Sequence, residues 1–127
     1  MTTFRLPNHL NENFHTVNMA LLKKHVHLLQ TLAKARPAMA RAIIQKSDRE
    51  LIRLLSEIAH NTLKGNVRLT NGQSSKLKRY RKQLHLLANK RASLTNKRKI
   101  LQKGGILPVL VGAIAPLLAG LIGGLAS

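Results

Sequence analysis

The first third of the chain carries hydrophobic residues at helical spacing. The repeat consists of Val17, Leu21, Leu28 and Leu32. Residues three, four or seven apart share one face of an α-helix, so the pattern predicts an amphipathic helix over about residues 14 to 35. Pro37 interrupts it, because proline lacks the backbone N–H and disfavours helical geometry in the residue before it. Proline also suits a first helical turn, so residues 38 to 46 are predicted to form a short second helix.

The next helix has the clearest local signal in the chain. Ser47 is followed three residues later by Glu50, and an apolar run begins at Leu51. A serine and a glutamate at this spacing are typical of a capping box, in which each side chain bonds the backbone N–H of the other residue. Gly65 favours a stop, because glycine readily adopts the left-handed conformation that closes a helix. We therefore expect a helix from the capping box to residue 64.

Two basic helices are predicted after a linker over residues 66 to 75. Asn71-Gly72 indicates a turn, and Ser74-Ser75 indicates a cap for the helix that follows. Hydrophobic positions then recur at steps of three and four: Leu77, Tyr80, Leu84 and Leu87. They predict a helix over about residues 76 to 91, and residues 93 to 103 are predicted to form another.

The C-terminal 24 residues, 104 to 127, carry no ionisable side chain. As a helix, the apolar stretch from Ile106 to Ala126 would be about 31 Å long, close to the thickness of a bilayer's hydrocarbon core. Its glycines and prolines give it poor intrinsic helicity in water. Three interpretations stay open: a membrane anchor, a membrane-active peptide, and a hairpin packed within an assembly through which the protein self-associates. The residues expected to contact lipid are Ile106, Leu107, Val109, Leu110, Val111, Ile114, Leu117, Leu118, Leu121 and Ile122.

Together these patterns predict an all-α protein of three to four helices, arranged as a small helical bundle or as extended helices, with a hydrophobic Gly/Pro-containing C-terminal tail. The expected regions are an irregular arm (1–12), a helical region (13–65), a linker (66–75), a basic helical region (76–103) and the tail (104–127).

The charge of the chain is extreme. Its 22 Lys and Arg face 4 Asp and Glu, which gives a formal net charge of +18, against about 2 to 8 for an ordinary small domain. Thirteen Lys and Arg fall between residues 64 and 103, a segment without an acid. Such a segment is expected to bind an external polyanion, most simply the phosphates of double-stranded DNA. The predicted phosphate contacts are Lys76, Lys78, Arg79, Arg81, Lys82, Lys90, Arg91, Lys97, Arg98, Lys99 and Lys103.

Other interpretations of these charges also stay open. They could form a solvated helix face, or bind anionic lipid or a ribosomal surface. Base-specific recognition is not expected, because zinc-finger spacing and a stacking platform are missing from the sequence. Tyr80 lies between Arg79 and Arg81 and could stack on a base, but its apolar spacing favours a core position.

The sequence offers little for catalysis or metal binding. It has no cysteine, and His25 and His27 point to different sides of a predicted helix. Four acids, one of them a predicted capping residue, do not supply a carboxylate pair for acid–base chemistry. Enzyme activity and cofactors are therefore not expected.

Residues 51 to 124 resemble the small basic protein of adintoviruses and related Polinton (Maverick) elements, which is likened to the adenovirus core protein X (mu). The similarity lies in Leu54–Asn66, Leu77–Lys82, Leu86–Lys90 and Lys97–Pro108. The resemblance implies a virion core component that condenses packaged DNA, found in the virion and the host nucleus, with a membrane-active tail as an additional feature.

The tail also resembles a substrate of adenovirus-type proteases, which cut after Gly-Gly. The matching residues are Leu121 to Leu125, with Gly124 as the candidate cleavage position. The alternative for the whole chain is a tail-anchored or membrane-lytic protein whose basic region binds anionic lipid, located at a membrane through its C-terminus.

Overall fold

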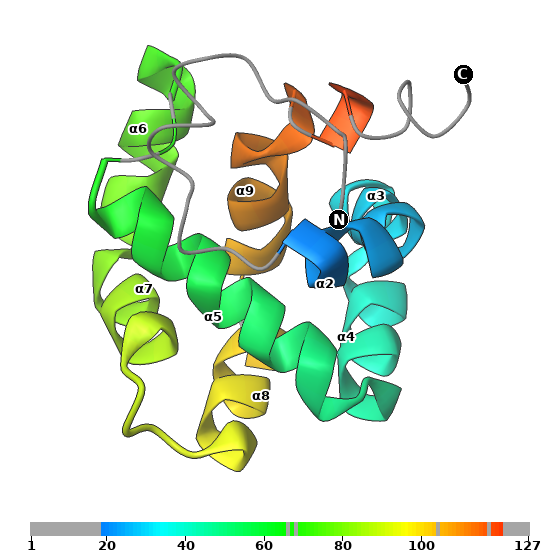
Figure 1. Cartoon of the computed structure of the whole chain (residues 1–127). Helices are drawn as coiled ribbons and strands as arrows, with labels where there is room; N and C mark the ends of the chain where they lie inside the picture. Colours follow the sequence, from blue (N-terminus) through cyan, green and yellow to red (C-terminus); the bar gives the residue numbers. More distant parts are fainter. Residues whose placement is uncertain (1–18, 66, 68, 104, 117, 121–127) are drawn as a thin grey trace.

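The computed structural model describes residues 19–65, 67, 69–103, 105–116 and 118–120, and every secondary-structure element that it assigns there is an α-helix (Figure 1). The helices are α2 (Met19–Lys24), α3 (Val26–Lys34), α4 (Pro37–Lys46), α5 (Arg49–Leu63), α6 (Asn71–Arg79), α7 (Arg81–Ala88), α8 (Leu94–Lys103) and α9 (Ile106–Ala113). The all-α prediction is confirmed. The prediction of three to four helices is wrong, because the described residues alone form eight.

Helix α5 lies at the centre of the packing. It runs across the molecule in Figure 1 and contacts α2, α7, α8 and α9. Most of its apolar residues are fully or almost fully buried, among them Leu51, Leu54, Leu55 and Ile58. At about 25 cal/mol per Å² of apolar surface, burial of such residues is the main driving force for this arrangement.

The predicted hydrophobic tail is wrong for the described residues, because its first part is a core helix. Helix α9 packs against α3 and α6, and Figure 1 shows it behind α5. The buried residues of the predicted tail are Ile106, Leu107, Leu110, Val111, Ile114 and Leu118, while Val109 is partly buried. A helix that is apolar on all sides is stable when protein surrounds it. Leu117, Leu121 and Ile122 lie outside the described residues.

Proline and glycine do not prevent α9 from forming. Pro108 occupies the third position of the helix, where the backbone N–H has no acceptor within the helix in any case. The carbonyl of Gly112 accepts a hydrogen bond of 3.1 Å from Nε2 of Gln73 on α6. In the part of the chain that is described, no helix has both the length and the apolar character needed to cross a bilayer.

Two predicted helices are each broken in two. His25 separates α2 from α3 and Tyr80 separates α6 from α7, with backbone angles of φ −108° and ψ 10° at His25 and φ −108° and ψ 16° at Tyr80. Both pairs fall in the bridge region between helix and strand. A change of helix direction at these residues lets both halves face the core, which hydrophobic spacing alone did not reveal.

The predicted capping box at Ser47 is wrong by one residue. Asp48 is the N-cap of α5, and its carboxylate accepts a hydrogen bond of 3.0 Å from the backbone N–H of Leu51. Ser47 instead ends α4, where its hydroxyl donates to the carbonyl of Ile44. The predicted stop is confirmed: Gly65 follows α5 with φ +76°, the left-handed conformation that favours glycine.

Helix α6 begins inside the segment predicted as a linker. Thr70 caps it, and a true capping box joins Thr70 to Gln73 through hydrogen bonds of 3.1 and 3.0 Å. The sequence prediction overlooked this pair because Asn71-Gly72 is more typical of a turn. Asn71 and Gly72 are tolerated in the first helical turn, where the backbone N–H groups have no acceptor within the helix.

Tyr80 joins α6 and α7 to the segment that follows α8. It is partly buried against the hydrophobic core, as its apolar spacing predicted. A Cβ atom added at Gly105 would lie 2.8 Å from the Tyr80 hydroxyl oxygen. Gly105 is therefore needed for close approach rather than for an unusual backbone angle, since its φ is −77°.

Candidate nucleic-acid interface

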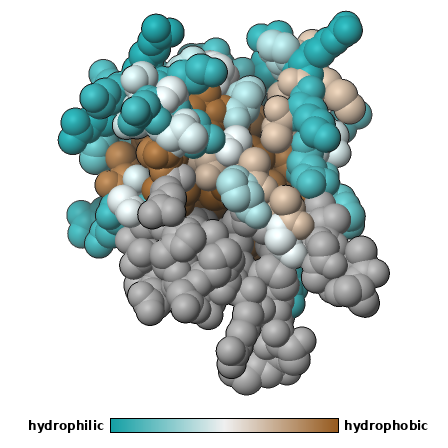
Figure 2. All heavy atoms as spheres, turned by 90° about the horizontal axis from the view of Figure 1, so that it is seen from above, coloured by the Kyte–Doolittle hydropathy of each residue, from teal (hydrophilic) through white to brown (hydrophobic). Residues whose placement is uncertain are grey.

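Most of the predicted phosphate contacts are exposed on the outer sides of α6, α7 and α8 and on the segment between α7 and α8. The exposed members are Lys76, Lys78, Arg79, Arg81, Lys82, Lys90, Arg91, Lys99 and Lys103. Contacts of α7 with α6 and α8 bring these elements together on the fold. Figure 2 views one face of the molecule, with hydrophilic residues gathered at its edges and hydrophobic residues visible between them.

Two of the described acids, Asp48 and Glu50, lie at the start of α5, and the third, Glu57, lies further along α5 in a cleft that Lys90 and Lys97 also line. Their ion pairs are Lys24–Glu50 at 2.6 Å, His25–Asp48 at 3.9 Å and Arg53–Glu57 at 3.8 Å. None of these pairs includes a Lys or Arg from the acid-free segment between residues 64 and 103. The cations of the acid-free segment therefore take part in none of these ion pairs, although Glu57 shares the cleft with two of them.

Arg98 has a structural contact that the sequence did not predict. One of its terminal nitrogens, Nη2, donates a hydrogen bond of 2.6 Å to the carbonyl oxygen of Ser47, where α4 ends. Its Nε is buried and has no partner among the described residues. The side chain therefore links α8 to the corner between α4 and α5, and only part of it is exposed to solvent.

Lys97 is buried rather than exposed, with 8% of its surface accessible. It lines a cleft of about 540 Å³ between α5 on one side and α8 with the segment after α7 on the other. Its ammonium group has no hydrogen bond or ion pair with another described residue. Burial lowers the pKa of Lys97 from its usual 10.5, because the charged form loses its hydration.

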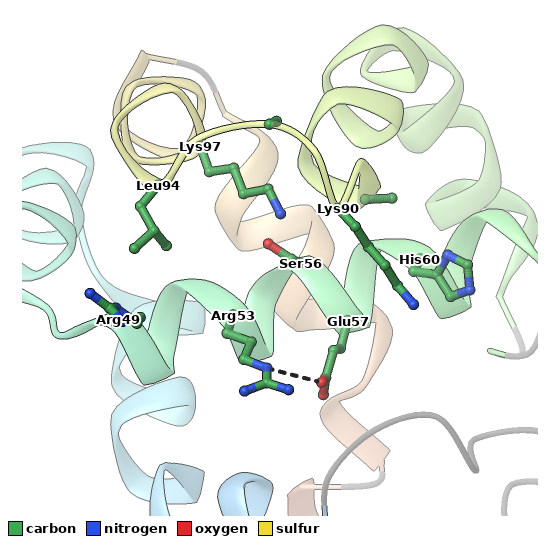
Figure 3. A pocket seen from close by; sticks show the side chains of 10 residues that line it. Arg49, Arg53, Ser56, Glu57, His60, Lys90, Leu94 and Lys97 are labelled. Atoms are coloured by element: carbon green, nitrogen blue, oxygen red, sulfur yellow. Dashed lines mark ion pairs between the residues drawn. The ribbon is translucent and has the colours of Figure 1, made fainter.

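The cleft is predominantly basic. Arg49, Arg53, Lys90 and Lys97 line it together with one acid, Glu57. With His60 neutral, these four cations and one anion leave a net charge of +3 on the walls. In Figure 3, Lys97 extends from α8 toward Ser56 of α5, and Lys90 extends toward Glu57 and His60.

Arg49 and Arg53 are site residues that the sequence analysis missed. They were overlooked because they precede the acid-free segment, in a helix that also carries acids. The available signal was helical spacing, since residues 49, 53, 56, 57 and 60 fall on one face of α5. That spacing identifies a polar face but not the cations from α8 that lie opposite it.

A second polar cluster combines His25, Asp48 and Glu50, whose potential ligand atoms lie within 4.8 Å of one another. The sequence did not indicate this cluster, because His25 lies more than twenty positions from both acids. The carboxylates already have partners, because Asp48 caps α5 and Glu50 pairs with the ammonium group of Lys24 at 2.6 Å. That ammonium group would repel a metal ion, so the cluster is explained as a charge-paired contact between α2, α3 and α5.

Comparisons with protein-family models, curated proteins and solved structures found no match to this chain. The candidate cleavage position Gly124 and the arm over residues 1–12 lie outside the described residues.

Proposed function

We propose that this protein binds nucleic acid without sequence preference and neutralises its charge. The observation that carries the proposal is the set of exposed cations on α6, α7 and α8 that take part in no ion pair with the described acids. A surface of this kind binds phosphates by releasing their condensed counterions, and this term depends on charge rather than on base identity.

Two structural features favour backbone contact over base recognition. Tyr80, the one aromatic residue in the basic region, packs against the core and against Gly105. It is therefore not placed as a stacking platform for single strands. The cations are spread over three helices of 8 to 10 residues and their connections, whereas base recognition commonly uses one helix aimed into the major groove.

The proposal that this nucleic-acid binding takes place inside a virion is based on the resemblance to adintovirus and Polinton basic proteins. In that context the protein condenses DNA inside a viral or transposon-derived virion and is located in the virion and the host nucleus. Condensation needs many weak phosphate contacts per chain rather than one tight site, and a net charge of +18 on 127 residues supplies them. A lipid-directed function is less well supported, because the described hydrophobic residues expected to contact lipid are fully or partly buried.

The experiment is a salt titration of binding to a labelled duplex of about 30 base pairs, followed by fluorescence anisotropy. With nine exposed cations, we expect a log–log slope near about −8, equal affinity for unrelated sequences, and weaker binding to anionic vesicles. A flat salt dependence, or no binding at low salt, would contradict the proposal.

A matched pair of variants locates the surface. Lys78→Gln with Lys82→Gln removes two exposed charges from α6 and α7, and the slope should become about 2 units shallower. Lys34→Gln with Lys46→Gln removes two exposed charges from the ends of α3 and α4. This control should change the slope by less than half as much. Equal changes would show that net charge alone governs binding.

A further inference from the structure

The cleft between α5 and α8 differs in kind from the exposed basic surface. Its cations come from two sides. Arg49 and Arg53 belong to α5, whereas Lys90 lies in the segment before α8 and Lys97 in α8. Figure 3 shows the two lysines extending toward α5. Side chains that converge across a concave surface can contact one small ligand together, which a flat charged surface cannot achieve.

Lys97 is the most informative residue of the cleft. More than nine-tenths of its surface is buried, since only 8% is accessible, and its ammonium group has no ion-pair or hydrogen-bond partner among the described residues. The hydrocarbon stem of Lys97 accounts for the burial, while its ammonium group lines the cleft and is accessible from it. Nothing in the packing of α8 requires an ammonium group here, because methionine has similar length and no charge. An anion in the cleft would supply the partner that the described residues do not.

We propose that this cleft, whose α5 side is lined by Arg49 and Arg53, binds a compact phosphate-bearing anion held by Lys90 and Lys97. Phosphate carries about two negative charges at neutral pH, and arginine and lysine are the side chains that bind it most often. A single carboxylate would leave more of the wall charge of +3 uncompensated. The cleft volume of about 540 Å³ lies within the range of roughly 300 to 1,000 Å³ for small-ligand sites.

Glu57 lowers the positive charge on the walls of the cleft. Its carboxylate lies 3.8 Å from the Arg53 guanidinium and lines the same cleft. The pair reduces the positive charge near α5, so a ligand with several phosphate oxygens gains most from the opposite side, where Lys90 and Lys97 extend. Removal of the Glu57 charge should therefore strengthen anion binding.

The phosphate could belong to a free polyphosphate or to the backbone of a nucleic acid. Only the second source rests on the proposed function, and the two are separable because the cleft residues differ from most of the exposed contacts. We would measure tripolyphosphate binding to the full chain by titration calorimetry, and duplex DNA binding in parallel at matched ionic strength.

The cleft variant combines Lys90→Gln with Lys97→Met, and the matched control combines Lys34→Gln with Lys46→Met. Both variants remove two positive charges. We expect one tripolyphosphate per chain in the wild type, a loss of affinity of about tenfold or more in the cleft variant, and less than about threefold in the control. Glu57→Gln should raise the affinity about threefold or more.

Two results would overturn the proposal. One is an equal loss of tripolyphosphate affinity in the cleft variant and the control, which would show that binding depends only on the net charge of the protein. The other is absence of saturable one-to-one binding in the wild type together with no gain in Glu57→Gln. Because Glu57→Gln adds affinity, its outcome does not depend on whether the cleft variant folds.

The DNA measurements identify the source of the phosphate. If it belongs to a nucleic acid, tripolyphosphate will compete with duplex DNA, and the cleft variant will lose more DNA affinity than the control. If it belongs to a free ligand, DNA affinity will be equal in the two double variants while tripolyphosphate affinity differs. Tripolyphosphate binding without any DNA binding would contradict the proposed function but would support anion binding in the cleft.

Discussion

Two lysines in different regions of this molecule differ in exposure and in whether they have a charged partner. At the corner of α2, α3 and α5, the Lys24 ammonium group lies 2.6 Å from Glu50 with 61% of its side chain exposed. In the cleft between α5 and α8, Lys97 is buried and has no partner among the described residues. The hydrogen bond to Glu50 raises the pKa of Lys24, while burial lowers the pKa of Lys97.

This difference indicates which charges maintain the fold and which are available for function. The corner pairs Lys24 with Glu50 at 2.6 Å and places Asp48 3.9 Å from the His25 ring, so its lysine has a partner within the fold. The cleft holds an excess of cations, and one of them, Lys97, is desolvated enough for its pKa to be lowered. Unbalanced buried charge is a common feature of binding sites, where the ligand supplies the balance.

The largest expected effect concerns the close contact between Gly105, the N-cap of α9, and Tyr80. Gly105→Ala places a Cβ 2.8 Å from the Tyr80 hydroxyl oxygen, so the protein should lose about 1 to 3 kcal/mol of unfolding free energy. Gly112→Ala is the control, because its Cβ meets nothing within 4 Å and alanine favours a helix by about 0.5 to 1 kcal/mol. Urea unfolding measures both, and equal destabilisation by the two changes would contradict the close contact.

A smaller effect, of opposite sign, is expected from Lys97→Met. Methionine fills a similar volume without the desolvation cost of the ammonium group, so unfolding free energy should rise by about 0.5 to 2 kcal/mol. Tripolyphosphate binding should weaken in the same variant. Thermal melts with and without the anion check both statements, and a destabilised variant would show that the Lys97 charge supports the fold.

The pH dependence of stability sharpens the comparison. The folded-state pKa of Lys97 lies below the usual 10.5, so the unfolded chain binds more protons between these two values. Unfolding free energy from this residue therefore rises with pH through that window. Lys24 behaves oppositely: its pKa lies above 10.5, so its contribution is present at lower pH and is lost as pH rises through the folded-state value. Denaturant midpoints from neutral pH to about pH 10 should rise less in Lys97→Met than in the wild type.

The smallest effect is expected at the corner. Lys24→Gln removes an exposed ion pair, and such pairs contribute little because solvent screens them and both side chains lose freedom. The melting temperature should change less than in Lys97→Met, and tripolyphosphate affinity should match that of the wild type. A loss of anion affinity in Lys24→Gln would contradict the separation of the two regions.

Local signals in the sequence predicted local features well. Pro37 begins α4, Gly65 stops α5 with a positive φ, and Tyr80 packs against the core. The errors concern boundaries where two local signals compete. Ser47 caps the end of α4 rather than the start of α5, and Thr70 starts α6 before the turn signal at Asn71.

The candidate site was predictable only in part. The acid-free run of cations identified the exposed residues of α6, α7 and α8, because charge and helical spacing both appear in the sequence. Arg49, Arg53 and the burial of Lys97 could not be predicted, since they depend on α8 lying opposite one face of α5. Residues separated by about forty positions meet there without any local pattern that pairs them.

The sequence by itself determined the helical content, the net charge of +18 and the confinement of acids to the first part of the chain. Only the tertiary structure decided that Ile106–Ala113 is a core helix and that Lys97 lies in a cleft. The physical reason is that propensity and charge belong to each residue, whereas burial depends on which surfaces meet. An apolar helix gains the same release from water in a lipid bilayer as among α3, α5 and α6, and the fold supplies the second environment.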